Sequence, residues 1–491
     1  MLRAVAIWLL ALPLAAANPA GRIREFLDSS PVVRQAFWGV RIEDLQQNRI
    51  LFERNANHLF LPASNAKLFT TGMALTRLGP DYRFETRVLA DRAPDSAGCV
   101  TSLRLVGGGD PNLSGRTIPY RPNSPPGNPL AAIDDLAAQV AAHGVRCVSG
   151  DVTGDDTAYV WEPYPDGWSI DDAVWDYGAA VSALSINDNT VTLTITPGRE
   201  LAGPAVISVT PPLAYYQIEN RVRTAAGDRN ITIDRLPGSR HVHVWGTLPL
   251  QDPGDTEALG IDDPALYAAY ALRDALTRRG IAVHGRVTAV HLYPEQIADL
   301  QAGPAPAPAA GVELARRESA PLVEDLRITD KVSQNLHAEM ALRAVARARR
   351  QIGSREAGIA ELQAFLGEIG VGKGSYNFAD GSGLSRLDMV TPAAVVALLA
   401  YVYHSSLRDA WLSLLPVGGQ DGTLHARMQS TPAAGRIFAK TGSLSHVAAL
   451  SGYARRKDGR MLAFSILVNN FAGPGTDVRA AMDRICTLMI E

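Results

Sequence analysis

The spacing of hydrophobic and polar positions predicts a compact opening unit. Residues 36–43 and 50–54 read as two strands of a hairpin. After Pro62, apolar residues recur at helical spacing as far as Gly79-Pro80, which ends the predicted helix.

From about residue 80 to 310 the pattern changes to short β-like runs broken by Pro and Gly. This pattern predicts a separate β-rich body with two helices. The predicted strands include 191–196, 205–209, 231–234 and 241–245, and the predicted helices are 131–142 and 264–279.

An Ala- and Pro-rich stretch at 302–311 is predicted to be a linker or a crossing between domains. Helical spacing of apolar residues returns after it. A three-stranded meander and a closing helix are predicted beyond it. The predicted helices are 332–351, 354–369 and 476–489, and the strands of the meander are 436–444, 447–456 and 460–469.

The N-terminus has the pattern of a secretory signal. Arg3 precedes an apolar run that ends in the small residues Ala15-Ala16-Ala17, so residues 1–17 are predicted to be removed and the mature chain exported. The alternative is an uncleaved anchor, but the run is shorter than the ~20 residues that a spanning helix needs. No later stretch is long enough to span a bilayer. A periplasmic location follows, with loose membrane association left open.

Composition narrows the classes of function. With 491 residues, two to four domains are expected. A net charge of −3 gives no reason to expect nucleic-acid binding. In an exported chain Cys99 and Cys147 could form a disulfide, which leaves Cys486 as a core residue. Three scattered cysteines make a poor metal site, and alternation within a strand explains His241 and His243 better than zinc does, so no metal or organic cofactor is expected.

The first candidate for chemistry is Ser64-Asn65-Ala66-Lys67, at the start of the first helix. Residues three apart share a helix face, so a partly desolvated Lys67 is placed to take the proton of Ser64. The helix N-terminus would stabilise negative charge developing at Ser64. The simpler alternative is a serine N-cap before an exposed lysine.

Two further motifs follow in the order that serine enzymes recognising penicillin require. Ser333-Gln334-Asn335 lies where one helix leads into the next, although an N-cap would explain it alone. Lys440-Thr441-Gly442 lies in the first strand of the meander, where Lys and Thr can meet a carboxylate and Gly allows close approach.

Together these motifs resemble those of the low-molecular-mass class C penicillin-binding proteins, the family of D-alanyl-D-alanine carboxypeptidases and endopeptidases. The resemblance covers most of the mature chain. Gln334 departs from the family, which often has Asp or another polar residue there. Further similar stretches are residues 107–111, 154–157, 181–189, 380–386 and 415–424.

The resemblance implies a mixed α/β fold, with an antiparallel sheet flanked by helices in an α/β/α core like that of serine β-lactamases. Between Ser64 and Ser333 the family carries two nested insert domains, which fits the β-rich body. The expected division is 18–77 and 314–491 for the catalytic domain, 78–102 and 178–313 for the outer insert, and 103–177 for the inner insert.

The resemblance also implies residue roles. Ser64 would be acylated by a D-Ala-D-Xaa bond or a β-lactam, with Lys67 as general base. Ser333 would relay a proton to the leaving amine, Asn335 would orient the substrate, and Lys440 would supply positive potential. The other implied residues are Thr441, Gly442 and Ser443 at the substrate carboxylate, the backbone N–H groups of Ser64 and Ser443 as oxyanion hole, and Asp155 at the free amino end of a diaminopimelate-type stem peptide.

Several alternatives remain at this point. Asp155 equally suits an ordinary polar turn. His337 and Glu339 are interpreted as helix packing and surface. A serine β-lactamase would share the core, but neither Glu-x-x-Asn nor Tyr-x-Asn occurs in the sequence. An inactive peptidoglycan-binding protein and an esterase are the other rivals. The intact motifs argue against the first, and the Lys440-Thr441-Gly442 carboxylate site argues against the second.

Overall fold

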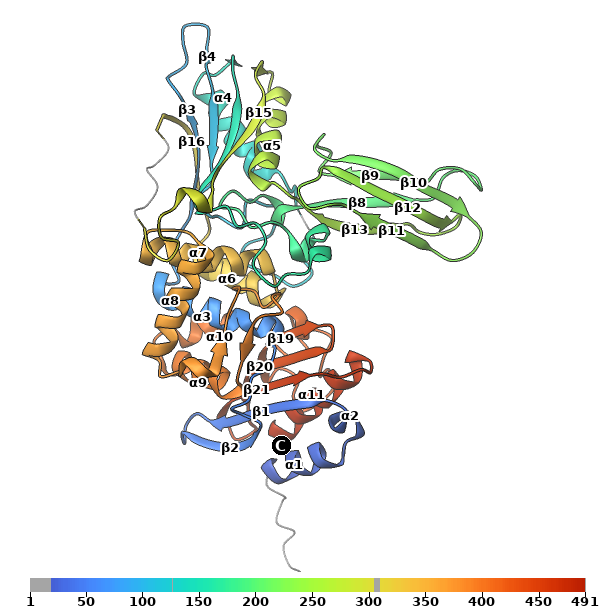
Figure 1. Cartoon of the computed structure of the whole chain (residues 1–491), viewed down its shortest axis with the longest axis vertical. Coiled ribbons are helices and arrows are strands. Elements are labelled where there is room, and N and C mark those ends of the chain that lie inside the picture. The colour runs from blue at the N-terminus through green and yellow to red at the C-terminus, as the bar shows by residue number, and fades with distance from the viewer. Residues whose placement is uncertain (1–18, 126, 304–309, 491) are drawn as a thin grey trace, which may run out of the picture.

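The computed structural model describes residues 19–125, 127–303 and 310–490. The predicted signal segment lies outside the described residues, as does most of the predicted linker. The described chain forms a helix-and-sheet domain with a second sheet unit stacked beside it and a β-rich arm (Figure 1).

The helix-and-sheet domain is built on a five-stranded antiparallel sheet in the order β19-β20-β21-β1-β2. The predicted hairpin and meander are therefore confirmed and share one sheet. The strands are β1 (Phe37–Asp44), β2 (Arg49–Arg54), β19 (Ile437–Leu444), β20 (Val447–Arg455) and β21 (Met461–Asn469).

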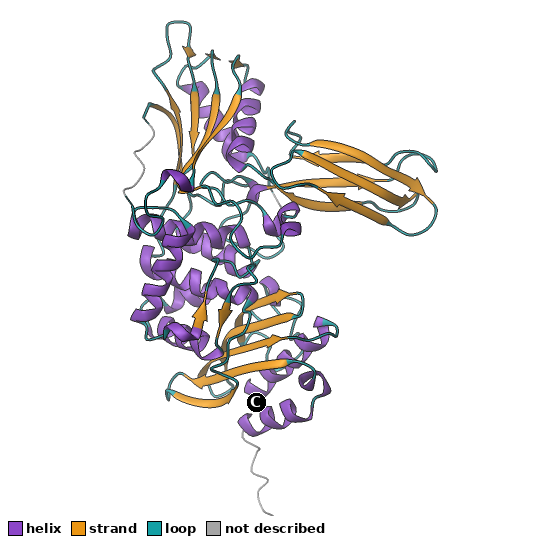
Figure 2. Ribbon diagram, in the orientation of Figure 1, coloured by secondary structure: helices purple, strands orange, loops and turns teal. Residues whose placement is uncertain are grey.

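Helices cover both faces of this sheet, as Figure 2 shows. On one face, side chains of the first two helices and the last helix pack on Val40, Leu450 and Ile466. On the other face, a helical layer packs on Ala449, Ala463 and Leu467. The helices of the first face are α1 (Pro19–Ser29), α2 (Pro31–Arg34) and α11 (Gly475–Ile490). Those of the second layer are α3 (Ala66–Leu78), α6 (Leu322–Lys331), α7 (Asn335–Arg350), α8 (Arg355–Glu368), α9 (Pro392–His404) and α10 (Arg408–Leu414).

The predicted α/β/α core is thus confirmed, and a two-stranded sheet and three short 3-10 helices complete it. Because helices cover both faces of the sheet, β20 and β21 are buried along almost their whole length and are mostly apolar. The remaining elements are η1 (Ala63–Asn65), η6 (Lys373–Ser375), β17 (Tyr376–Asn377), β18 (Met389–Val390) and η7 (Gly422–Leu424).

The insert forms two β-rich units. The first is a mixed five-stranded sheet in the order β15-β7-β5-β3-β16 with two helices, and a small sheet that carries the Cys99–Cys147 disulfide extends it. The disulfide that the sequence allowed is present, and Cys486 is buried as expected. The elements are β3 (Glu85–Ala90), β4 (Cys99–Val100), β5 (Leu103–Val106), α4 (Ala131–Ala142), β6 (Cys147–Val148), β7 (Val152–Val160), α5 (Pro264–Arg278), β14 (Ala282–Val283), β15 (Val287–Leu292) and β16 (Val312–Glu318).

The second unit consists of two three-stranded sheets that form the arm in Figure 1. β8 alternates between buried and partly exposed residues, and both sheets contribute residues such as Val191 and Val244 to a shared core. The strands are β8 (Thr190–Thr196), β9 (Val206–Thr210), β10 (Gln217–Ala225), β11 (Asn230–Asp234), β12 (His241–Pro249) and β13 (Asp255–Gly260). The connecting segments contain η2 (Ile170–Val174), η3 (Asp176–Gly178), η4 (Asn187–Asn189) and η5 (Pro294–Gln296).

The strand pairing differs from the predicted nesting of the inserts. β5 and β7 were expected in the inner insert, but they pair with β3 and β15 of the expected outer insert. The expected boundary at residue 314 falls within β16, which pairs with β3. The division expected from the family resemblance therefore cuts through one sheet, because the order of segments along the chain does not show which strands pair.

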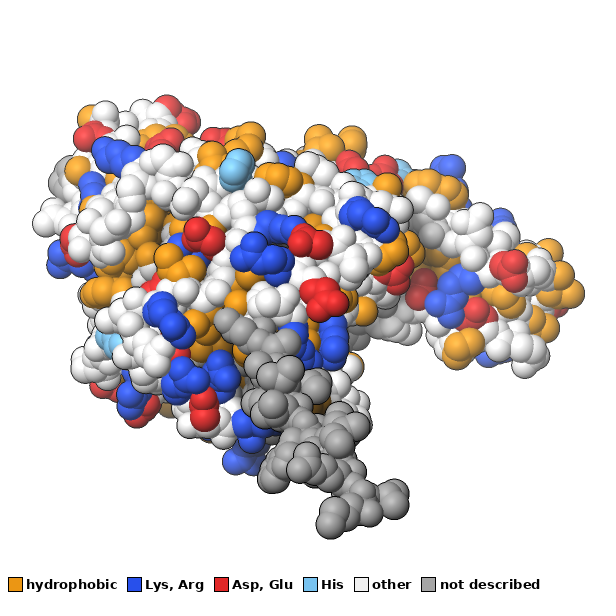
Figure 3. Space-filling view, turned by 90° about the horizontal axis from the view of Figure 1, so that it is seen from below, with side chains coloured by type: hydrophobic (Ala, Val, Ile, Leu, Met, Phe, Trp, Pro, Cys, Tyr) orange, Lys and Arg blue, Asp and Glu red, His pale blue; other side chains and the backbone are white. Residues whose placement is uncertain are grey.

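The surface carries both signs of charge. On the face seen in Figure 3, basic and acidic side chains are interspersed with apolar ones, and no extended region of one sign appears on that face. Within residues 19–125, 127–303 and 310–490, no helix has the length and apolar character needed to cross a bilayer.

Candidate active site

Ser64 lies on a short 3-10 turn, η1, that runs directly into α3. Lys67 is in the first turn of α3, so its ammonium reaches back to the serine. The Lys67 Nζ atom donates a hydrogen bond to Ser64 Oγ at 3.0 Å. The structure therefore brings together the pair that the sequence predicted on one helix face.

Lys67 is fully buried, and each of its three hydrogen-bond acceptors is neutral. Besides Ser64, its Nζ donates to Asn335 Oδ1 at 2.5 Å and to the backbone carbonyl of Ser382 at 2.7 Å. Burial lowers the pKa of Lys67 to about 8, although the charges of Asp380 and Asp330 oppose this shift. An appreciable fraction of Lys67 is thus neutral near pH 8 and able to accept a proton.

Ser333-Gln334-Asn335 forms the junction between α6 and α7. Ser333 has a left-handed backbone with φ of 65°, and the Gln334 side chain caps α7 by accepting from Leu336 N at 3.1 Å. The helix predicted to begin at residue 332 therefore begins at Asn335. This break turns the Ser333 hydroxyl and the Asn335 amide toward Lys440 and Lys67 respectively.

Asn335 joins the catalytic domain to the insert. Its Oδ1 accepts from Lys67, and its Nδ2 donates to the backbone carbonyl of Tyr177, in η3, at 2.8 Å. The amide orientation is therefore fixed on both sides, and a segment of the insert forms part of the site's wall.

Lys440, on β19, is the second buried lysine of the site. Its Nζ donates to Ser333 Oγ at 2.8 Å and to the backbone carbonyl of Thr441 at 3.0 Å. Burial, followed by the charge of Lys67, lowers the pKa of Lys440, whereas Asp330 opposes the shift. The two lysines and two hydroxyls thus form adjacent pairs, Lys67 with Ser64 and Lys440 with Ser333.

Two glycines allow neighbouring segments to pack against the turn that carries Ser64. A Cβ at Gly442 would lie 2.8 Å from the carbonyl oxygen of Pro62 and 3.1 Å from the Ala63 Cβ. Gly383 has φ of 80°, and a Cβ there would lie 1.9 Å from the carbonyl oxygen of Ala63. Gly442 therefore contributes to the site by close approach of the backbone.

Thr441 and Ser443 lie on the same strand as Lys440. Thr441 Oγ1 donates to Thr423 Oγ1 at 2.8 Å, and Ser443 is exposed near the end of β19. Hydroxyls of two segments are thus available beside Lys440 for an anionic group.

Asn65, Glu339 and Asp380 hold the site in place. Sequence reasoning gave no role to Asn65, interpreted Glu339 as packing and surface, and placed Asp380 in a Gly-rich stretch similar to the family. Asn65 Nδ2 donates to the backbone carbonyl of Lys440 at 3.0 Å, which ties the serine turn to β19. Asp380 accepts from the backbone N–H groups of Ser382 and Gly383 at 3.1 and 2.7 Å.

Glu339 supports the same turn, because its Oε1 accepts from Gly381 N at 2.7 Å. The side chains of Glu339 and His337 are both fully buried. The interpretation of these residues as helix packing is confirmed, and their interpretation as surface residues was wrong. Nothing in the local sequence of α7 signals these roles, which depend on contacts with segments distant in the chain.

Asp155 lies outside this constellation. It is 2% exposed within β7, where its carboxylate accepts from Thr157 Oγ1 at 2.6 Å and faces Arg104 at 3.4 Å. Its oxygens already have partners within the insert sheet, so the predicted contact with a stem-peptide amine is not supported. The simpler interpretation as a local structural Asp fits, on a strand and not in a turn.

The described residues contain no cluster of three or more His, Cys, Asp or Glu arranged to hold a metal ion. His243 pairs with Glu219 at 2.7 Å across neighbouring strands, in agreement with the sheet interpretation.

Comparisons with known proteins agree with this geometry. The family described as D-Ala-D-Ala carboxypeptidase 3 (S13) matches residues 20–489. A D-alanyl-D-alanine carboxypeptidase of Actinomadura sp. (strain R39) is 36% identical, with 99% of this chain and 89% of the relative covered.

Solved structures share the fold. Penicillin-binding protein 4 from Haemophilus influenzae superimposes with a TM-score of 0.80 at 24% identity, covering 95% of this chain and 98% of that one. A predatory peptidoglycan endopeptidase from Bdellovibrio bacteriovorus reaches a TM-score of 0.51 at 16% identity, over 93% and 92% of the chains. The family resemblance and the fold expected from the motifs are confirmed.

Proposed function

Because the chain belongs to the D-Ala-D-Ala carboxypeptidase 3 (S13) family, we propose that it is a serine D,D-peptidase that acts through an acyl-enzyme on Ser64. The substrates are D-Ala-D-Ala termini and D-Ala-diaminopimelate-type cross-links of peptidoglycan, and penicillins acylate the same serine. The observation that carries the proposal is the contact between Ser64 Oγ and a fully buried Lys67 whose pKa is lowered.

In the first half-reaction, neutral Lys67 takes the proton of Ser64 as the oxygen attacks the carbonyl carbon of the penultimate D-Ala. The backbone N–H groups of Ser64 and Ser443 stabilise the oxyanion. As the C–N bond breaks, the leaving amine receives a proton through Ser333. Water then attacks the ester, and its proton returns to the site as Ser64 is released.

The remaining residues position the substrate. Lys440 and Thr441, neighbours on β19, attract the terminal carboxylate of the leaving D-Ala through a positive charge and a hydroxyl donor. Asn335 orients both Lys67 and the substrate peptide. No metal or organic cofactor takes part in this scheme.

For the free amino end of a stem peptide, the acidic segment around η3 replaces Asp155 in our proposal. Tyr177 of this segment contacts Asn335, and Asp172 interacts with both Tyr177 and Arg386. A carboxylate and a guanidinium beside the site suit a group that carries both an amine and a carboxylate.

Export to the periplasm is part of the proposal and rests on the predicted signal at residues 1–17. Peptidoglycan lies outside the cytoplasm, so the substrate requires an exported enzyme.

The test is intact-mass spectrometry of the mature protein over time after addition of benzylpenicillin. We expect a long-lived adduct of one penicillin per chain, absent in Ser64→Ala and present in Ser96→Ala, a control at an exposed insert serine. An adduct that clears within seconds while drug is consumed would indicate a β-lactamase. Folded protein that forms no adduct would contradict the serine mechanism and favour a binding protein.

A further inference from the structure

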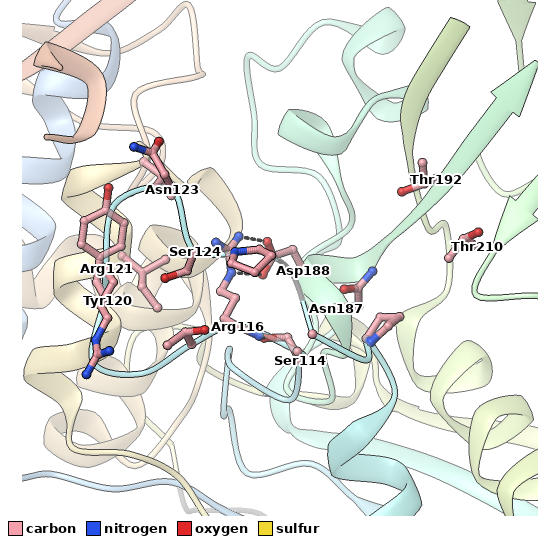
Figure 4. Close-up of a pocket in the computed structure, with 17 residues that line it drawn as sticks. Ser114, Arg116, Tyr120, Arg121, Asn123, Ser124, Asn187, Asp188, Thr192 and Thr210 are labelled. Carbon is pink, nitrogen blue, oxygen red and sulfur yellow. Dashed lines mark hydrogen bonds and ion pairs between the residues drawn. The ribbon is translucent and has the colours of Figure 1, made fainter. Parts of the chain in front are cut away.

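A pocket of about 490 Å³ lies between the insert segments 114–125 and 127–129 and the end of α6 (Figure 4). Val332 forms part of its wall and directly precedes Ser333 in the chain. The pocket therefore borders the site, although none of its lining residues takes part in the scheme above.

The pocket is elongated, and one end faces the catalytic domain. Figure 4 shows Tyr120 and Arg121 at one end, Thr192 and Thr210 at the other, and the Arg116–Asp188 ion pair between them. The side chain of Tyr120 contacts the backbone of Gly422.

Gly422 connects this end of the pocket to the site. It precedes Thr423, whose hydroxyl is bonded to Thr441. The Tyr120 end thus lies next to the place proposed for the carboxylate of the leaving residue.

The lining carries an excess of positive charge. Its cations are Arg116 and Arg121, and Asp188 is the only carboxylate among the lining residues. Asp188 already pairs with Arg116 and lies 3.0 Å from His337 Nε2. Arg121 has no ion-pair partner among the described residues and is exposed.

Since the Asp188 charge is shared between two cations, the pocket suits an anionic ligand. The polar side chains Ser114, Thr117, Asn123 and Ser124 also line it and can bond peptide groups.

We propose that this pocket binds the leaving stem peptide of a cross-linked substrate, with Arg121 facing one of its carboxylates. The inference rests on the proposed function. When a stem peptide ends in D-Ala, the leaving group is one amino acid, which ends at the carboxylate beside Thr441. When the bond is a cross-link, the leaving group continues as a second peptide, and the pocket is the cationic space that begins beside that carboxylate.

The test compares kcat/KM for a purified cross-linked peptide dimer and for a monomeric pentapeptide. Arg121→Ala is expected to lower the dimer-to-monomer ratio of kcat/KM roughly tenfold, because one charge-assisted contact is lost from the dimer complex only. Arg121→Lys should restore most of the ratio, since it keeps the charge. The matched control is Arg223→Ala, an exposed arginine on β10 in the arm, which should leave the ratio as in the wild type.

Equal losses on both substrates, or an unchanged ratio in Arg121→Ala, would overturn the inference. A wild type that cleaves the monomer but not the dimer would overturn it while leaving the carboxypeptidase in place. A loss confined to dimers that carry their sugars would also overturn it, because the pocket would then bind glycan. Failure of the proposed function is distinguishable, since benzylpenicillin would then form no adduct.

Discussion

Lys67 and His337 are two buried basic residues whose surroundings differ. In the catalytic cleft, Lys67 donates only to neutral oxygens, and burial lowers its pKa to about 8. Where the insert meets α7, His337 lies between Asp325 at 2.7 Å and Asp188 at 3.0 Å. Burial lowers the pKa of His337, but the two carboxylates outweigh it and raise the pKa to about 9.

The insert contains a second cation of the same kind. His291, on β15, lies 2.9 Å from Asp156 and 3.5 Å from Asp263. Burial again acts to lower its pKa, and the two aspartates raise it to about 10. Both histidines therefore carry a charge at neutral pH and join segments that are distant in the sequence.

Direct contact with carboxylates explains the difference. The cleft also contains buried carboxylates, but their oxygens have other partners: Asp380 binds backbone N–H groups, and Glu339 binds Arg343 and Gly381. They act on Lys67 only from a distance, so they moderate the effect of burial without reversing it. A buried cation held by carboxylates serves structure, whereas one held by neutral acceptors stays able to exchange a proton.

We expect the largest effect from Lys67→Arg, which should nearly abolish acylation of Ser64. A guanidinium stays protonated at any working pH and cannot take the proton of Ser64. We expect the rate of acylation by benzylpenicillin to fall about 10³-fold, measured by intact mass over time. Lys373→Arg, at an exposed lysine, is the control and should acylate at the wild-type rate. Acylation of Lys67→Arg within tenfold of wild type would exclude Lys67 as the base.

His337→Gln should destabilise the junction between the insert and α7. The substitution leaves Asp325 and Asp188 without the cation between them, and removing one partner of a buried ion pair costs about 3–5 kcal/mol. We expect a loss of free energy of unfolding near the lower figure, since Arg116 still pairs with Asp188. Urea denaturation measures it, with His284→Gln at an exposed insert histidine as control. A loss no larger than that of the control would show that the charge of His337 is not structural.

The pH dependence of acylation tests the lowered pKa of Lys67. Only neutral Lys67 accepts the proton, so the rate should rise about tenfold per pH unit below the pKa and level off above pH 8. Stopped acylation reactions between pH 6 and 9 test this in wild type and Lys373→Arg. A rate that does not change over this range would contradict a base with a pKa near 8.

The pH dependence of stability tests the raised pKa of His337. His337 keeps its proton up to a pKa of about 9, whereas unfolded histidine loses it near 6.5. Its contribution is complete below pH 6.5 and is lost as the pH rises toward 9, by at most about 1.4 kcal/mol per pH unit. Urea denaturation across this range should show a smaller decline in His337→Gln than in wild type. Equal declines would assign the effect to other groups, such as His291.

Local patterns were sufficient for several of the elements and for the three motifs. The spacing of apolar residues predicted α4, α8 and the meander within a residue or two, because helix and strand periods are properties of the segment itself. The Ser64–Lys67 pair was predictable for the same reason, since a single helix turn brings the two side chains together.

Contacts between distant segments could not be read in this way. The nested boundaries expected from the family resemblance separate β5 and β7 from β3 and β15, with which they pair. Asp155 matched a family motif, but its carboxylate is occupied within its own sheet. Glu339 reads as an ordinary helix residue until the Gly381 turn is placed against it.

The sequence by itself thus determined the candidate site residues, because the three motifs specify residue types at fixed local spacings. The tertiary structure decided how those residues ionise and what else the site contains. Lys67 and Lys440 have lowered pKa values because segments more than 100 residues apart bury them beside neutral acceptors. Burial and long-range contact depend on the packing of the whole chain, and no local pattern encodes them.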